Sequence, residues 1–431
     1  MTDTQPLVLD PSAADIQGEL ARIRARGPVA EVVLPGGVPA WSVTDATVLR
    51  HLLTDPRVSK DAHQHWPRFI DGEIGPDWVM FPWVAARNML TTYGEQHQRL
   101  RKLVAPAFTH KRTQALRPRI EAFVTELLDA LSAVADGEIV DLRASFATAL
   151  PIRVIGELMG VPAGMDEQLR IHADGILDTS LHPAEVGAHF GALFVLMEEL
   201  LRHKRENPGD DLTTVLMNAH DDADGSRLDE QELRDTLLLI ITAGHETTAN
   251  LVDHSIIGLL THAQQRKAAL AEQIPWSEVV EEGLRWNAPL AHMPMRFAVE
   301  DIDIAGDSSF PDVRINRGDV IIASLGGAGR DRKLHGDNAD AFDAGRRSKE
   351  HLAFGYGVHH CLGAPLARLE ATIALPALFT RFPDLELAVE PGELRSIPSI
   401  VTNGHREIPV HRTAGRSRAE QFANWRKPAG Q

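Results

Sequence analysis

FGYGVHHCLGAPLARLE, residues 354–370, holds the only cysteine of the chain, Cys361, among three glycines at positions 355, 357 and 363. Glycines allow a backbone to approach a flat ligand closely and to point its N–H groups at one atom. A helical pattern with Pro365 in its first turn follows directly. A cysteine at the start of a helix has its thiolate stabilised by the helix dipole. The segment therefore predicts a thiolate that binds a metal.

Other readings of the same motifs are weaker. A buried structural cysteine is the simplest alternative, because a free cysteine behaves as a small hydrophobic residue, but three surrounding glycines argue against it. A dinucleotide-binding loop would need a third glycine where His360 stands. The pair His245-Glu246 would need a second histidine at position 249 to form a zinc-protease helix, and that residue is Ala249.

The composition indicates an ordinary globular chain of 431 residues. Hydrophobic residues make up 43% and charged residues 24%, so we expect a large buried core rather than disorder. One cysteine excludes a disulfide-stabilised scaffold and a cysteine-rich zinc or iron–sulfur cluster. A formal charge of −16 argues against binding of nucleic acid or anionic lipid by the chain as a whole.

The ends and the domain organisation follow from the same reading. The amino terminus lacks the basic and apolar regions of a signal peptide, and no stretch approaches the ~20 apolar residues that cross a bilayer. We therefore expect a soluble, cytoplasmic, monomeric protein without a membrane anchor. No linker or repeat divides the chain, so we expect one domain over residues 1–411 and a disordered tail over residues 412–431.

Hydrophobic spacing predicts a mainly α fold with minor β sheets. Apolar residues recur at steps of three and four in most long segments, as at 120, 123, 124, 127, 128 and 131. Strand signals are few and short, at residues 29–34, 40–43, 296–298, 320–322 and 400–410.

The longest predicted helix begins after Asp229, which forms a capping box with Glu232, and continues to about Leu260. Some thirty residues at 1.5 Å each give a rod of roughly 45 Å. Its middle, TAGHETT at residues 242–248, contains a glycine, an acid and β-branched alcohols, where an apolar sequence would be more stable.

Together these segments resemble the cytochrome P-450 family. FGYGVHHCLG matches the haem-binding motif F-G-x-G-x-H-x-C-x-G at every fixed position, and AGHETT at 243–248 resembles the oxygen-activating part of the family's central helix. Residues 282–285 and 342–346 resemble its E-x-x-R pair and the arginine-bearing meander. The resemblance covers roughly residues 20–411. It implies a single triangular-prism fold, with haem between the long central helix and the cysteine loop.

The resemblance also implies a chemistry: a haem-thiolate monooxygenase that uses haem b and O2. Cys361 would be the axial iron ligand. Glu246 and Thr247 would relay protons towards dioxygen. Charge-assisted donors to the haem propionates would be His97, Arg101, Arg296 and His359. We expect a stabilising rather than a catalytic ion network from Glu282, Arg285 and Arg346.

A basic segment suggests how electrons arrive. Residues 96–119 contain seven lysines and arginines and no acid, which leaves −23 for the rest of the chain; the basic positions are 99, 101, 102, 111, 112, 117 and 119. In this family the segment borders the docking face for the electron donor, so we expect an acidic ferredoxin or flavodoxin-like partner, itself supplied by NAD(P)H through a reductase. The alternative is a solvated basic helix without a partner.

Apolar residues near the implied haem predict a hydrophobic substrate. The expected pocket residues are Met80, Leu239, Ala243, Leu290 and Ile400. The segment around residues 54–69 resembles an actinobacterial subfamily that oxidises steroids, macrolide-type polyketides or smaller aromatics. Alternatives for the whole protein are a peroxygenase driven by hydrogen peroxide and a non-catalytic protein that binds haem or an apolar ligand.

Overall fold

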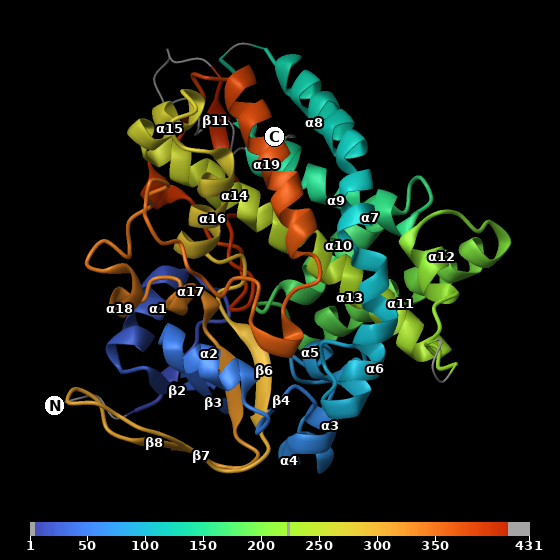
Figure 1. Cartoon of the computed structure of the whole chain (residues 1–431), viewed down its shortest axis with the longest axis vertical. Helices are drawn as coiled ribbons and strands as arrows, with labels where there is room; N and C mark the ends of the chain where they lie inside the picture. Colours follow the sequence, from blue (N-terminus) through green and yellow to red (C-terminus); the bar gives the residue numbers. More distant parts are fainter. Residues whose placement is uncertain (1–4, 136, 222–224, 413–431) are drawn as a thin grey trace.

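The structure, a computed structural model, describes residues 5–135, 137–221 and 225–412 (Figure 1). Helices fill the upper and right parts of the view, and the main sheet lies at the lower left beside α1 and α2. The first half contains α1 (Ile16–Ala25), α2 (Ala46–Thr54), α3 (Ala62–His65), α4 (Pro67–Ile70), α5 (Pro82–Ala85), α6 (Gly94–Val104), α7 (His110–Ala115), α8 (Arg117–Ser132), α9 (Ala149–Met159), α10 (Asp166–Leu177), α11 (Pro183–Glu206) and α12 (Leu212–Met217). The second half contains α13 (Glu230–Gly244), α14 (Glu246–Thr261), α15 (Ala263–Leu270), α16 (Trp276–Trp286), α17 (Leu325–Ala328), α18 (Arg332–His335) and α19 (Ala364–Arg381). The predicted mainly α fold with minor sheets is confirmed.

The main sheet has the strand order β1-β2-β3-β9-β6-β4. Its strands are β1 (Leu7–Val8), β2 (Val29–Leu34), β3 (Val38–Val43), β9 (Val320–Ala323), β6 (Met293–Ala298) and β4 (Val58–Ser59). Two smaller sheets pair β7 (Ile302–Ile304) with β8 (Val313–Ile315), and β5 (Val140–Asp141) and β10 (Glu386–Leu387) with β11 (Pro409–His411). Four predicted strands are thus confirmed. In the fifth region, 400–410, only its last two residues belong to a strand.

The predicted central helix is present but interrupted. Asp229 and Glu232 form the expected capping box, and α13 ends at Gly244 while α14 begins at Glu246. The prediction of one continuous rod to Leu260 is therefore wrong at His245. Threonine hydroxyls bond back to the helix here, Thr247 to Ala243 O and Thr248 to Gly244 O, and such bonds disturb a helix.

One hydrophobic core lies where α8, α14, α16 and α19 pack against one another, and Figure 1 shows α19 beside α14. The six apolar residues that predicted a helix around residue 120 are all buried in α8. Among the described residues, every helix falls short of the length and apolar character needed to cross a membrane.

The predicted structural ion network is confirmed. Arg285 donates to both carboxylate oxygens of Glu282 at 2.7 Å, and both side chains are fully buried. Arg346 lies 3.6 Å from the same carboxylate. Arg285 also donates to three backbone carbonyls, of Gly329, Ala339 and Ala341, and so fastens α16 to the loop that precedes the cysteine segment. Of the predicted tail, residues 413–431 lie outside the described residues.

Candidate functional site

The cysteine loop makes a tight turn just before α19. Gly355 and Gly357 have φ values of 70° and 71°, in the left-handed region that favours glycine. A side chain at Gly357 would come within 2.9 Å of Leu53 O, so the loop also needs glycine for close packing. The N–H of Cys361 donates to Phe354 O at 2.9 Å, which closes the turn.

The thiol of Cys361 lies at the end of this loop, where the residue has surface open to solvent although protein atoms surround the sulfur closely. Burial by surrounding protein atoms raises the pKa of the thiol, while the N–H groups of Gly363 and Ala364 act in the opposite direction. These N–H groups lie at the start of α19, where the helix dipole stabilises negative charge. A metal cation opposite the sulfur would supply the further stabilisation that a thiolate needs.

Hydrogen-bond donors from histidine and arginine side chains gather beside the cysteine loop. His97 on α6 and His359 in the loop meet with ring centroids 4.2 Å apart. Arg101, one turn further along α6, donates to His360 O at 2.7 Å. Burial, together with the charges of Lys60, His97, Arg296 and Arg101, lowers the pKa of His359 to about 2. The structure thus brings the four predicted propionate donors and Cys361 into one region.

Two atoms in this cluster are buried without a hydrogen-bond partner among the described residues, His97 Nε2 and Arg296 Nη1. Burial lowers the pKa of Arg296 to about 10, and no carboxylate of the described chain offsets it. Lys60, which the sequence did not single out, is also buried, and its ammonium donates to Pro294 O at 2.8 Å. Buried cations need an anion, so this cluster is suited to a ligand with carboxylate groups.

The junction between α13 and α14 borders an open space. Ala243 is exposed although Ile241 and His245 on either side are fully buried. A side chain at Gly244 would come within 2.7 Å of Ile155, so glycine allows α9 to pack closely against the junction. Thr247 donates its hydroxyl to Ala243 O at 2.7 Å.

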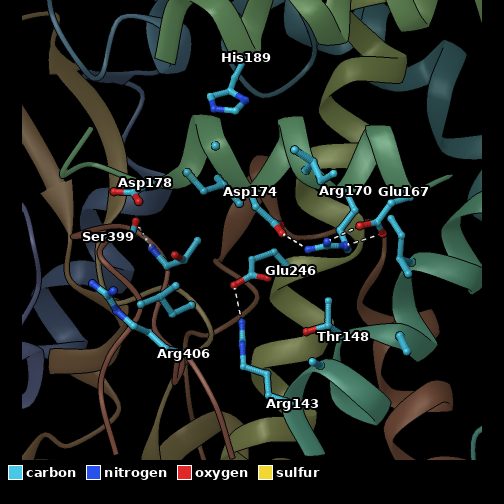
Figure 2. Close-up of a pocket in the computed structure, with 18 of the residues that line it drawn as sticks. Arg143, Thr148, Glu167, Arg170, Asp174, Asp178, His189, Glu246, Ser399 and Arg406 are labelled. Carbon is cyan, nitrogen blue, oxygen red and sulfur yellow. Dashed lines mark hydrogen bonds and ion pairs between the residues drawn. The ribbon is translucent and has the colours of Figure 1, made fainter. Parts of the chain in front are cut away.

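Glu246 lines a polar cavity of about 700 Å³, where its carboxylate faces Arg143 (Figure 2). Its carboxylate accepts from Arg143 at 2.8 Å. Burial raises the pKa of Glu246, and the negative charge of Asp174 adds to that effect, while Arg143 opposes it. Glu246 therefore keeps a proton at higher pH than an ordinary glutamate does.

Asp174 on α10 is a second carboxylate that lines this cavity. It accepts from Arg170 at 2.9 Å and bonds to His245 Nε2 at 2.9 Å (Figure 2 shows the Arg170 contact). Burial alone would lower the pKa of His245, but the hydrogen bond and charge of Asp174 outweigh it and raise that pKa. Sequence reasoning missed Arg143 and Asp174, because neither lies in a motif and only the fold brings them to Glu246.

The predicted substrate residues divide into two groups by burial. Met80 and Ile400 are almost fully buried in one hydrophobic cluster. Leu290, which packs against that cluster and forms an isolated bridge with Thr402, and Leu239 are half-buried, and Ala243 is exposed. The last three are therefore the predicted residues best placed to touch a ligand.

The basic segment is partly neutralised. Arg99 pairs with Glu232, Lys102 with Asp221, and Arg119 with Glu157 at 3.0 Å. Arg117 is exposed and lies 3.5 Å from Glu121, and Lys111 is exposed as well. The positive charge offered to a partner is therefore smaller than the sequence count indicates.

Comparison with known proteins decides the family. A profile described as cytochrome P450 matches residues 186–398. The chain is 45% identical over 406 residues to 2-hydroxy-5-methyl-1-naphthoate 7-hydroxylase of Streptomyces carzinostaticus, covering 94% of this chain and 97% of that protein. The chain belongs to the cytochrome P450 family. It is a cytochrome P450 monooxygenase, so the predicted enzyme class is confirmed.

Solved P450 structures agree with this fold. CYP154A1 from Streptomyces coelicolor A3(2) matches with a TM-score of 0.87 at 48% identity, over 94% of this chain and 99% of that one. The "Testerone bound" form of CYP154C4 from Streptomyces sp. ATCC 11861 matches with a TM-score of 0.89 at 44% identity, over 95% and 99% of the two chains. The predicted resemblance to bacterial P450s is confirmed.

The P450 family implies a haem iron and the use of O2, and the residues present fit that group. Haem carries two carboxylates, and the cluster holds buried cations that no carboxylate of the described chain neutralises. It also needs a sulfur ligand, and Cys361 is the only cysteine, with its thiol on an exposed residue at a helix start.

Proposed function

We propose that this P450 inserts one oxygen atom from O2 into a C–H bond of a hydrophobic, fused-ring substrate. The observation that carries the proposal is the group of buried cations beside Cys361 that lacks a carboxylate partner in the described chain. Haem, when bound, supplies iron that activates dioxygen. Cys361 is the proposed iron ligand.

The propionates bind, in this proposal, to His97, Arg101, Arg296 and His359. Two of these side chains, His97 and Arg101, lie on α6, whereas Arg296 lies on β6 and His359 in the cysteine loop, so haem binding ties three segments together. His97 Nε2 and Arg296 Nη1 lack hydrogen-bond partners in the described chain. A buried donor without an acceptor costs free energy, so a hydrogen bond from these two atoms to a propionate would stabilise the complex most.

Glu246 and Thr247 form the proposed proton route. Glu246 lines the polar cavity, and its raised pKa suits it to hold a proton on the carboxyl group and pass it on. Thr247 follows it directly, on the helix junction where Ala243 is exposed. Rotation of the Glu246 side chain from Arg143 towards Thr247 would carry the proton from the cavity wall to the hydroxyl.

Relatives support the choice of substrate class. One is named for hydroxylation of a naphthoate, and another is described with a bound steroid, and both ligands consist of fused rings. In this chain the small side chain of Ala243 is exposed at the helix junction, and Leu239 and Leu290 add apolar surface. We therefore place steroids and naphthalene-type aromatics ahead of macrolides among the predicted substrates.

Electrons reach the haem, in this proposal, from NAD(P)H through a reductase and a separate acidic ferredoxin or flavodoxin-like protein. Arg101 holds α6 against the cysteine loop, which exposes Tyr356 and Val358. Exposed Lys111 and Arg117 lie on the elements that follow α6. An apolar centre with basic residues near it suits a transient acidic partner.

A double variant tests this docking face. K111E combined with R117E would raise the KM for such an electron donor and leave reduction of the haem by dithionite unchanged.

The proposal is tested on the purified haem-loaded protein. The reduced carbon monoxide complex is expected to show the absorption band of a thiolate-ligated haem, and steroids and naphthoates are expected to shift the ferric haem spectrum on binding. Absence of the thiolate band would contradict the site. A shift by macrolides, with none by fused-ring compounds, would contradict the substrate class. E246Q should lower product formation by about 10²-fold or more if Glu246 supplies protons.

A further inference from the structure

Strand pairing places a second buried cation opposite Arg296. β4 and β6 are antiparallel, with Val58 opposite Ala298 and Ser59 opposite Phe297. Lys60 directly follows β4, and continuing this register by one residue sets it opposite Arg296. Side chains at directly opposite positions of antiparallel strands lie close together, and two like charges there repel each other.

Neither cation is offset by the protein. Lys60 and Arg296 are each only 5% exposed. Within the described chain, Lys60 has one hydrogen bond, to Pro294 O, and Arg296 Nη1 has none. Burial and the charge of Arg296 lower the pKa of Lys60 well below its ordinary value. Lysine is almost never fully buried without a partner, so this pair requires an anion that the described chain does not provide.

The neighbouring groups indicate which anion. Arg296, which lies opposite Lys60, is one of the four expected propionate donors. Two others, His97 and His359, contact each other with ring centroids 4.2 Å apart. All of these side chains are cations or donors, and no described carboxylate offsets Arg296 or Lys60. The site thus has more positive charge than the four expected donors supply.

We propose that Lys60 is a further propionate-binding residue, which anchors the haem and holds the iron reduction potential more positive than a neutral residue would. The inference rests on the proposed function, since it requires haem bound at Cys361. A nearby positive charge favours the ferrous state, which carries one positive charge fewer than the ferric state.

A purely structural role is the rival explanation. The pairing of β6 with β9 shifts register between Met293 and Arg296, and the Lys60 ammonium satisfies Pro294 O inside that irregular stretch. On that view any donor of suitable length would serve, and charge would be irrelevant. K60Q keeps an amide donor but loses the charge, whereas K60R keeps the charge.

The experiment uses the haem-loaded protein and two measurements other than turnover. Transfer of haem to excess apomyoglobin gives the rate of haem loss, and a spectroscopic redox titration gives the iron midpoint potential. We expect K60Q to lose haem about tenfold faster or more, as for a lost charge-assisted hydrogen bond, and to shift the potential to more negative values. K60R should resemble the wild type in both. K267Q, at an exposed lysine on α15, is the matched control.

The outcomes separate the two proposals. If K60Q keeps the thiolate band and matches the wild type in both measurements, the role of Lys60 is overturned and the proposed function stands. If the wild type itself shows no thiolate band, both are overturned. K60M, a neutral variant of different shape, replaces K60Q if glutamine impairs folding, and the same results decide.

Discussion

Arg143 donates through one terminal nitrogen to Glu246 and through the other to Asp253, each at 2.8 Å. It reaches them from the π-helical turn at residues 143–147, and all three side chains are buried. One cation thus serves two buried carboxylates in α14, one of which lines the polar cavity. Asp253 has a second hydrogen-bond partner in His405, whose Nδ1 lies 2.7 Å from its carboxylate, whereas the hydrogen bond of Glu246 is to Arg143. This difference is consistent with the raised pKa of Glu246 and the lowered pKa of Asp253.

Removal of this arginine is expected to destabilise the protein strongly. R143M leaves Glu246 and Asp253 buried without their shared cation, which costs about 3–5 kcal/mol in the free energy of unfolding. Denaturant titration of the haem-loaded protein measures it. R153M removes an exposed arginine that pairs with Glu126, and it should cost less than about 1 kcal/mol. An equal loss of unfolding free energy in R143M and R153M would show that the buried ion pairs stabilise the protein no more than an exposed pair does.

Substitution of Thr247 tests the proton route. T247A should lower the fraction of consumed NAD(P)H that yields hydroxylated product and raise hydrogen peroxide release, because proton delivery beside the haem is impaired. Product and peroxide are measured together in a system with a ferredoxin and a reductase. T248A is the matched control, since Thr248 is buried and donates its hydroxyl to Gly244 O. Unchanged coupling in T247A would remove Thr247 from the route.

Replacement of the cysteine tests the iron ligand. C361H and C361S should both lose the thiolate band of the reduced carbon monoxide complex, because no second cysteine exists in the chain. Far-ultraviolet circular dichroism checks that the variants remain folded. A thiolate band that persists in either variant would contradict the assignment of Cys361.

Local motifs were the predictable part of this molecule. The glycines and cysteine of residues 354–363 lie next to one another in sequence, so their turn and the start of α19 could be predicted. The Asp229–Glu232 capping box is local as well. The break at His245 was not predicted, because it depends on threonine hydroxyls that compete with the backbone of an otherwise regular helical pattern.

Contacts between distant segments were the unpredictable part. Asp174 and His245 are 71 residues apart, and Arg143 and Glu246 are 103 apart. Lys60 meets the site only through the pairing of the short strand β4 with β6. An isolated arginine, aspartate or lysine carries no pattern, so the part of the site that depends on such pairs required the fold.

The pair of Asp174 and His245 predicts a pH-dependent stability. The pKa of His245 is raised in the native state, so its stabilisation is complete below about pH 6.5, the ordinary histidine pKa, and is lost as pH rises through the raised value. D174N should therefore cost about 1 kcal/mol at pH 6, a modest figure because Asp174 is partly open to the cavity and water screens the pair. The cost should be smaller at pH 9. Denaturant titrations at both pH values measure it, and a larger cost at pH 9 would reverse the sign and refute the account.

Substitution of Glu370 is expected to stabilise the protein, unlike the substitutions above. It is 2% exposed on α19, its Oε2 lacks a hydrogen-bond partner in the described chain, and burial raises its pKa well above the ordinary value. The native state therefore keeps the proton of Glu370 at pH values where the unfolded chain releases it, so stability falls as pH rises above about 4.3, the ordinary glutamate pKa.

E370Q cannot ionise, and its free energy of unfolding at pH 8.5 should exceed that of the wild type by about 1–3 kcal/mol. The advantage should shrink towards pH 5.5. E206Q, at an exposed glutamate on α11, should change stability by less than about 0.5 kcal/mol at both pH values. An E370Q protein that is less stable than the wild type at pH 8.5 would mean that the Glu370 carboxylate has a favourable partner in the native state.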